Sequence, residues 1–263
     1  MLGRCRLPRA AVLSRHLTST ATDRTVSIAM SGCGWLSCFY LGVIEELKAH
    51  KYLTRSSLMA GTSGGSLSAL IACADVDPKV ALEFMIELSM DKTFTRNIDK
   101  GLRANLPKLL PGDTLDRVNG RLHVFTTSIY PNPQRMLEPS VISRFRDMNH
   151  LIDCVSASSF IPLYSSRDLF TRITGSPELF IDGGLAAWMP TIGDVRVAPF
   201  PRQWLMRRPP HIYIPDDGKY SLPRLLHHVF IPPSPETTRD IYNQGKKAVH
   251  IWMHSMEQKS HQK

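Results

Sequence analysis

Gly61, Ser63 and Gly65 carry the clearest chemical potential in this chain, because they form a Gly-x-Ser-x-Gly pattern. The apolar residues 58–60 before it predict the end of a buried strand, and the small residues 66–72 after it predict a helix. Strand, sharp turn and helix form the setting of a nucleophile elbow, where the serine lies at the helix N-terminus and a developing anion is stabilised. A Gly/Ser-rich turn without chemistry is the alternative.

A second glycine-rich turn, Gly32-Cys33-Gly34, lies between a predicted strand over 25–30 and a predicted helix. Such a turn can point backbone N–H groups at an oxyanion. A nucleotide phosphate loop is the rival interpretation, but its Gly-x-Gly-x-x-Gly pattern would need glycine where Ser37 stands. With an elbow serine downstream, we favour the oxyanion hole.

The best candidate for a general base is Asp182, which follows an apolar strand and precedes Gly183 and Gly184. A carboxylate in this setting points into a tight backbone site, although an Asp-Gly hairpin turn has the same sequence. Burial beside Phe180 and Ile181 would raise the pKa of Asp182 and make proton transfer from a serine easier. No histidine lies in a comparable setting.

Strands alternate with helices along the chain, which predicts a mostly parallel sheet. Sites in such sheets lie at the carboxyl ends of strands, so the turn after residue 30 and Ser63 are expected to share one crevice. Strands are expected over 25–30, 58–60, 121–127, 179–181, 195–197, 211–214 and near Met136, helices over 34–50, 66–72, 80–90, 148–158, 222–230 and 236–256, and irregular structure over 91–113.

His250 and His254 have the spacing of the two histidines in a zinc-protease helix. Ile251 stands where the catalytic glutamate of that motif belongs, and no third ligand is evident. The sequence therefore predicts no metal site and no cofactor.

Four blocks together resemble the patatin-like phospholipase family, specifically its adiponutrin-type subgroup. In chain order, they are residues 31–36 with Tyr40 and Gly42, residues 61–67, residues 157–164 with the sequence Ala-Ser-Ser-Phe-Ile-Pro-Leu-Tyr, and residues 182–184 with Pro190, followed by Pro199-Phe200. They lie within residues 25–200 and are far more specific together than singly.

The resemblance implies a three-layer α/β/α fold with a mostly parallel central sheet. It implies a catalytic dyad without histidine, in which Ser63 is the nucleophile and Asp182 the general base. The N–H groups of Gly32, Cys33 and Gly34 would stabilise the oxyanion. The expected activity is hydrolysis of lipid acyl esters (phospholipase, lysophospholipase or acylglycerol lipase) through an acyl-enzyme.

Two alternatives stay open: acyl transfer from the same acyl-Ser63 to a lipid alcohol, and lipid binding by a protein with an inactive site. Ser37 replaces the last glycine of the family's loop, and Trp188 stands where many members have asparagine. Trp188 would either narrow the acyl pocket or pack in the core.

Composition sets the broad class of the chain. Its 263 residues carry a net charge of +9 and are 43% hydrophobic, and this hydrophobic content fits an ordinary globular core. Residues 1–22 contain four arginines and no acidic residue, which predicts a mitochondrial transit peptide or else a basic tail without an address. The hydrolase domain would then be 23–263, with C-terminal helices within 221–258. The widely spaced cysteines are expected to be free thiols.

A basic and apolar segment suggests how the protein meets lipid. Arg202, Trp204, Arg207 and Arg208 could dock on an anionic membrane or a lipid-droplet surface, with the tryptophan inserted and the arginines at phosphates. A solvated loop with a packed tryptophan is the alternative. We expect a lipid ester as substrate, no nucleic-acid partner, and a peripheral membrane location, mitochondrial or otherwise cytoplasmic.

Overall fold

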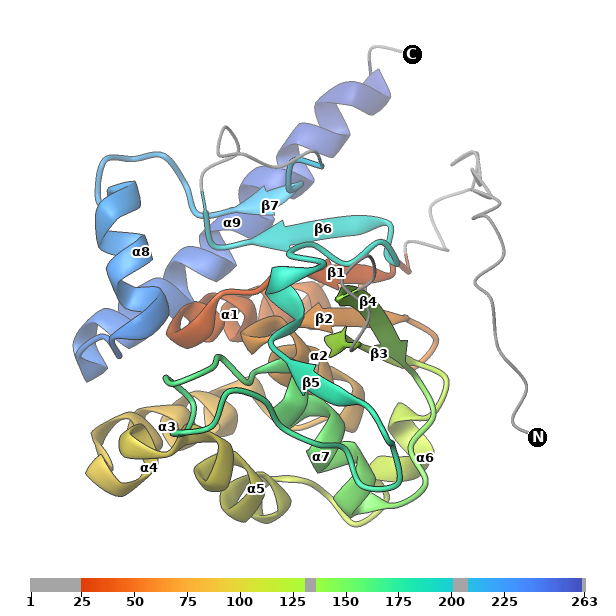
Figure 1. Ribbon diagram of the computed structural model, residues 1–263. Coiled ribbons are helices and arrows are strands. Elements are labelled where there is room, and N and C mark those ends of the chain that lie inside the picture. Colours follow the sequence, from red (N-terminus) through yellow and green to blue (C-terminus); the bar gives the residue numbers. More distant parts are fainter. Residues whose placement is uncertain (1–24, 131–135, 201–207, 262–263) are drawn as a thin grey trace.

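The computed structural model describes residues 25–130, 136–200 and 208–261 (Figure 1). The predicted leader over 1–22 lies outside these described residues, and so do Arg202, Trp204 and Arg207 of the predicted docking segment. Arg208 is described and exposed.

A seven-stranded sheet forms the centre of the described part of the chain. Its strands are β1 (Ile28–Met30), β2 (Met59–Thr62), β3 (Leu122–Ile129), β4 (Leu137–Ile142), β5 (Leu179–Ile181), β6 (Val195–Ala198) and β7 (Ile212–Tyr213). The order is β4-β3-β2-β1-β6-β7, and β5 pairs with β3. Every pairing except β3 with β4 and β3 with β5 is parallel, which confirms the predicted mixed α/β fold with a mostly parallel sheet.

Two strands meet end to end along one edge of β3. In the parallel pair, Thr62 at the end of β2 lies opposite Phe125. In the antiparallel pair, Ile181 at the end of β5 lies opposite Thr127. Since β4 occupies the other edge of β3 over the same residues, β2 and β5 share one edge. Their carboxyl ends therefore face each other across the single residue Thr126, which brings the residues after them together.

The predicted helices are present. They are α1 (Ser37–Ala49) after the 3₁₀ turn η1 (Gly34–Leu36), α2 (Gly64–Ala74), α3 (Pro78–Met90), α7 (Met148–Ser158), α8 (Leu222–Phe230) and α9 (Pro235–His261). The side chain of Asp77 caps α3 by accepting a hydrogen bond from Lys79 N–H. No helix of the described residues combines the length and hydropathy that a bilayer-spanning segment needs.

The expectation of irregular structure over 91–113 is wrong. This stretch forms α4 (Lys92–Arg96) and α5 (Ile98–Leu109), and α6 (Thr114–Val118) follows. Asn97 caps α5 by accepting from Lys100 N–H, and Leu102 and Leu106 are buried one turn apart on one face. Pro107 lies in the last turn of α5, where burial of that face outweighs the backbone hydrogen bond it removes.

The two faces of the sheet are covered differently. Ile28 and Met30 belong to the buried core, and in Figure 1 α1, α2 and α9 lie behind the sheet. Ala29 points to the other face, where Gly193 lies against its backbone. The segment after β5, which includes the 3₁₀ turn η3 (Gly183–Leu185), crosses this second face in front of the strands.

Candidate active site

Ser63 occupies a strained turn between β2 and α2. Its φ of 54° and ψ of −130° are unfavourable for a residue with a side chain and are typical of functional turns. A Cβ on Gly61 would lie 2.3 Å from the carbonyl oxygen of Gly65, and a Cβ on Gly65 would lie 2.5 Å from that of Ser31. The turn therefore requires glycine at both positions, which explains the two glycines of the Gly-x-Ser-x-Gly pattern.

The turn is held in place by Ser158, the last residue of α7. The Ser63 backbone N–H donates to Ser158 Oγ at 2.9 Å, and Ser158 Oγ donates to the carbonyl oxygen of Phe125 at 2.7 Å. This buried hydroxyl joins the elbow to β3. The sequence placed Ser158 in a family segment but assigned it no role, because its partners are distant in the chain.

The backbone around Asp182 is fixed on three sides. Its N–H donates to the carbonyl oxygen of Phe160 at 2.7 Å, and its own carbonyl oxygen accepts from Thr127 Oγ1 at 2.8 Å. Its Oδ1 accepts from Gly184 N–H at 2.7 Å. A Cβ on Gly183 would lie 2.2 Å from a backbone oxygen of β3, so this glycine permits the close approach of η3.

Asp182 is 7% exposed as a residue, and burial raises the pKa of its carboxyl group to about 6. The nearby Ser63 side chain and the N–H of Gly184, which donates to Oδ1, both lower the pKa, but burial outweighs them. Oδ2 is buried and has no partner of standard hydrogen-bond geometry among the described residues. The carboxylate therefore has one buried oxygen, Oδ2, that is free to accept a proton. The Ser63 side chain lies close enough to influence the pKa of this carboxylate.

The glycine turn faces the elbow, with one change from expectation. Gly32 N–H donates to the carbonyl oxygen of Trp188 at 3.1 Å and so is not a free donor for an oxyanion. The N–H groups of Cys33 and Gly34 have no acceptor within the described part of the chain, and neither has that of Gly64. A Cβ on Gly64 would lie 2.7 Å from the Gly34 oxygen and 2.8 Å from Cys33 Sγ, so the two turns are in contact.

Gly64 lines the cavity beside Ser63 and is a candidate oxyanion donor that the sequence analysis did not name. The residue after the nucleophile supplies an oxyanion donor in serine hydrolases with an elbow, so the pattern itself could have identified it. Burial is the main cause that raises the pKa of the Cys33 thiol, and Cys38 and Asp182 raise it further. Cys33 therefore stays a neutral thiol beside the carboxylate.

A cavity of about 890 Å³, counting the space at its mouth, opens beside Ser63. Most of its wall is apolar and comes from α2, α3, α4 and α5. Its lining includes Gly34, Trp35, Ser37, Ser63, Gly64, Leu67, Ile71, Ala81, Phe84, Met85, Leu88, Phe94, Ile98, Leu102, Leu106, Leu109, Ile161, Tyr164 and Val229. The helices that were expected to be irregular thus supply much of this wall.

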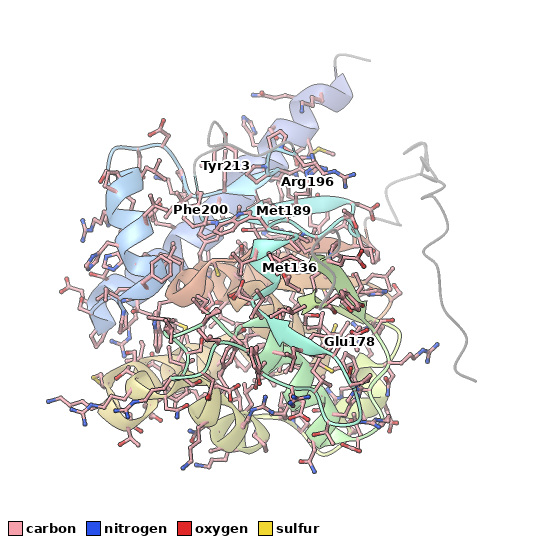
Figure 2. All side chains as sticks on the ribbon, viewed as in Figure 1. Met136, Glu178, Met189, Arg196, Phe200 and Tyr213 are labelled. Carbon is pink, nitrogen blue, oxygen red and sulfur yellow. The ribbon has the colours of Figure 1, made fainter. Side chains whose placement is uncertain are left out.

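Trp188 and Ser37, the two departures from the family pattern, lie in different parts of the structure. Trp188 does not line the cavity; its ring packs against Phe200, with centroids 5.7 Å apart. Figure 2 shows Phe200 and Met189 beside β6 and β7, away from α3–α5. Ser37 lines the cavity and donates to Met85 Sδ at 3.2 Å. Trp188 therefore packs behind the glycine turn, and Ser37 is the departure that faces the cavity.

Comparison with known proteins places this arrangement in context. The family model described as patatin-like phospholipase matches residues 28–193. Patatin-like phospholipase domain-containing protein 2 from Homo sapiens is 28% identical over 68% of this chain and 36% of its own length. Omega-hydroxyceramide transacylase from Mus musculus is 29% identical over 64% of this chain and 28% of its own length.

The chain therefore spans about a third of the length of these relatives. The crystal structure of VipD from Legionella pneumophila covers 66% of this chain and 50% of that one, with 14% identity and a TM-score of 0.42. The family model spans β1 to the segment before β6 and so includes both Ser63 and Asp182. Since it matches more than half of the sequence, this chain belongs to the patatin-like phospholipase family.

Proposed function

We propose that this protein is a lipid acyl hydrolase that uses Ser63 as nucleophile and Asp182 as general base. The free, buried Oδ2 of Asp182 supports the role of base, and the strained turn at Ser63 supports that of nucleophile. A base needs a pKa near the working pH, and the raised pKa of about 6 meets this need without a histidine.

In the proposed reaction, Ser63 Oγ attacks the ester carbonyl carbon and its proton passes to Asp182. The N–H groups of Cys33, Gly34 and Gly64 stabilise the oxyanion. The carbon–oxygen bond to the leaving alcohol breaks, and Asp182 returns the proton to that alcohol. Water then attacks the acyl-Ser63 ester with Asp182 as base, which releases the fatty acid and restores the serine.

The single observation that carries this proposal is that Ser63 lies on the wall of the apolar cavity. An acyl chain in this cavity would place its ester at the hydroxyl, and burial of its methylene groups would supply binding energy. Carboxylic esters of long-chain fatty acids are therefore the proposed substrate class.

Acyl transfer is the second candidate, and one relative is named a transacylase. The acyl-Ser63 intermediate would then be attacked by a lipid alcohol instead of water. The third reading, a lipid-binding protein without activity, is disfavoured because the serine, the carboxylate and the free N–H groups all face one site.

We also propose that the protein meets its substrate at a lipid surface. Leu163, Phe230 and Ile231 are 70%, 47% and 50% exposed. They lie beside Tyr164 of the cavity wall, whose hydroxyl donates to the Phe230 carbonyl oxygen. The exposed Arg208, together with Arg202, Trp204 and Arg207, would add positive charge and an aromatic anchor at the membrane. We further propose that residues 1–22 direct the protein to mitochondria. A tagged chain that lacks these residues should no longer be imported into mitochondria, whereas the tagged full chain should be.

A fluorophosphonate probe tests the chemistry directly, because it labels an activated serine. Wild-type protein should be labelled, whereas Ser63→Ala should not, and Asp182→Asn should be labelled much more slowly. Mass spectrometry of products from mixed lipid extracts then separates free fatty acid from acyl-transfer products. Absence of labelling in folded wild-type protein would favour the lipid-binding alternative.

A further inference from the structure

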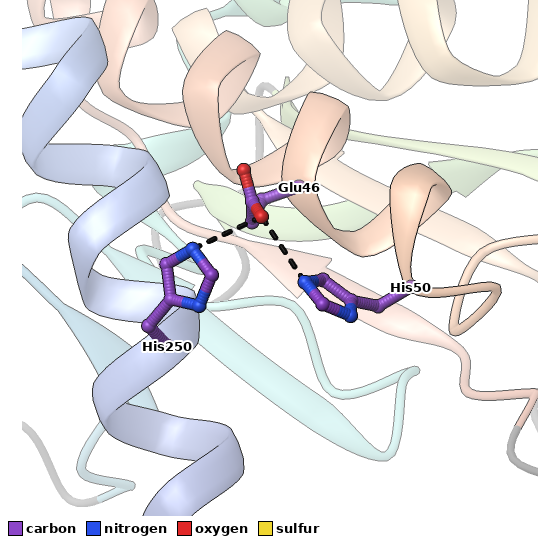
Figure 3. Close-up of side chains that lie close together, drawn as sticks. All are labelled: Glu46, His50 and His250. Carbon is purple, nitrogen blue, oxygen red and sulfur yellow. Dashed lines mark hydrogen bonds and ion pairs between the residues drawn. The ribbon is translucent and has the colours of Figure 1, made fainter.

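Glu46, His50 and His250 converge at the surface, where the end of α1 lies beside α9 (Figure 3). Glu46 lies in the last turn of α1, His50 is the C-cap residue of that helix, and His250 belongs to α9. Glu46 Oε1 lies 3.1 Å from His50 Nε2 and 3.0 Å from His250 Nε2. The three ligand atoms all lie within 4.8 Å of one another, so two imidazoles and one carboxylate face the same point.

From this convergence we propose that the three side chains form a binding site for Zn²⁺. Two histidines and a carboxylate are a known ligand set for this ion, with bonds of about 2.0–2.2 Å. A tetrahedron with such bonds has edges of about 3.3 Å, so the two observed nitrogen-to-oxygen separations need only small changes. Water would complete the fourth position.

The ligands lie on a rigid support, because α1 and α9 touch through their backbones. A Cβ on Gly42 would lie 1.9 Å from the carbonyl oxygen of Tyr242, and a Cβ on Gly245 would lie 2.2 Å from that of Phe39. Glu46 follows Gly42 by one turn on the same face of α1. The close crossing therefore fixes how far apart the ligands can be, which lowers the cost of assembling the site.

The surrounding charges are compatible with a divalent cation on Oε1. Lys246 Nζ lies 3.7 Å from the other oxygen of Glu46 and 3.3 Å from Glu45 Oε1. Lys246 can stay paired with Oε2 of Glu46 while the ion binds Oε1. A contact of this kind to the non-coordinating oxygen orients a metal-binding carboxylate. The side chains of His50 and His250 are 41% and 56% exposed, so an ion can reach them from solvent.

This site differs from the histidine pair considered from sequence. His254 lies outside the cluster and contacts Gln258 and Glu257 on its own helix. The ligands that join His250 come from α1, about 200 residues earlier, so the spacing within α9 could not reveal them. The proposal is independent of the proposed hydrolase activity, because the site fastens α9 to α1 and does not touch Ser63.

Isothermal titration with Zn²⁺ alone, on the full chain without an affinity tag, tests the site. We expect one ion per chain and at least a tenfold weaker affinity in His50→Gln and in His250→Gln. A hundredfold excess of Zn²⁺ over its Kd should raise the Tm of the wild type by roughly 5–10 °C, and this rise should be lost in both variants.

His254→Gln, one turn further along α9, is the matched control and should bind as the wild type does. His227→Gln, at an exposed histidine of α8, is a second control and should also bind Zn²⁺ as the wild type does. If the double variant His50→Gln/His250→Gln keeps its circular dichroism spectrum and still binds one Zn²⁺ with wild-type affinity, the assignment is wrong. A wild-type chain that binds no Zn²⁺ at 100 µM total metal, roughly ten times a Kd of about 10 µM, overturns it as well.

Discussion

Ser158 Oγ accepts the backbone N–H of Ser63 at 2.9 Å, so the last side chain of α7 sets the conformation of the elbow. The same hydroxyl donates to the carbonyl oxygen of Phe125 in β3. Two residues later, the carbonyl oxygen of Phe160 accepts the N–H of Asp182. One short segment therefore positions both members of the proposed dyad, although it supplies no reacting atom.

Ser158→Ala should lower kcat/KM by roughly 10- to 100-fold. The change leaves the buried N–H of Ser63 without its acceptor and a carbonyl oxygen of β3 without its donor, at about 1–3 kcal/mol for each group. Steady-state kinetics on a soluble ester measure the effect. Ser156→Ala is the matched control, since Ser156 Oγ is buried without a partner in the described residues, and it should keep full activity. Equal losses in the two variants would remove the positioning role.

The acidic limb of the pH–activity profile should lie near pH 6. Burial raises the pKa of Asp182 to about 6, and only the ionised carboxylate can accept a proton from Ser63. Activity should therefore fall about tenfold for each pH unit below the limb. Initial rates with a non-ionisable ester between pH 4 and pH 8 measure it, and a limb at pH 4 or lower would contradict the proposed base.

Asp182→Asn should abolish activity and yet stabilise the fold at neutral pH. The folded pKa lies above the unfolded value, so the folded state binds the proton more tightly, and stability from this group falls as pH rises from about 4 to about 6. A shift of about two pKa units corresponds to about 3 kcal/mol. The asparagine avoids this cost and keeps the acceptor for Gly184 N–H.

Thermal unfolding of the wild type and Asp182→Asn at pH 4 and pH 7.5 measures this difference. The Tm advantage of the variant should be several degrees at pH 7.5 and should nearly vanish at pH 4. If the variant is less stable than the wild type at both pH values, the ionised carboxylate stabilises the fold through its partners, and burial does not destabilise it as argued here.

Much of this arrangement could be predicted from the sequence, because local patterns determine it. The elbow glycines, the capped start of α3 and the apolar strands each have short-range signals. The wall of the cavity could not be predicted in the same way. Pro107, Pro111 and Gly112 indicate irregular structure over 91–113, and only burial of Leu102 and Leu106 makes α5 a helix. The hydrogen bond that occupies Gly32 N–H likewise depends on Trp188, a residue distant in the chain.

The depth of the cavity should determine acyl-chain preference. Ala81 on α3 lines the cavity and is 4% exposed, so Ala81→Leu adds volume where a long chain would lie. The ratio of kcat/KM for long over short acyl esters should fall by about 10-fold or more, at an overpacking cost of about 1–3 kcal/mol. Val80→Leu changes the exposed neighbour outside the cavity and should leave the ratio unchanged. An unaltered ratio in folded Ala81→Leu would place the acyl chain elsewhere.

The exposed side chains of Leu163, Phe230 and Ile231 beside Tyr164, here called the apolar rim, should mediate binding to lipid surfaces. Leu163→Ser/Ile231→Ser removes two side chains that are 70% and 50% exposed, so the fold should tolerate it. Because each of the two inserted side chains contributes about 1–2 kcal/mol, binding to anionic vesicles should weaken by roughly 30- to 1,000-fold. Vesicle co-sedimentation measures binding, and kinetics on a soluble short ester should be unchanged. Ile251→Ser, 51% exposed on α9, is the control and should bind normally. If the rim variant and the control sediment alike, the surface that meets lipid lies on another face, and the segment that contains Arg208 becomes the next surface to vary.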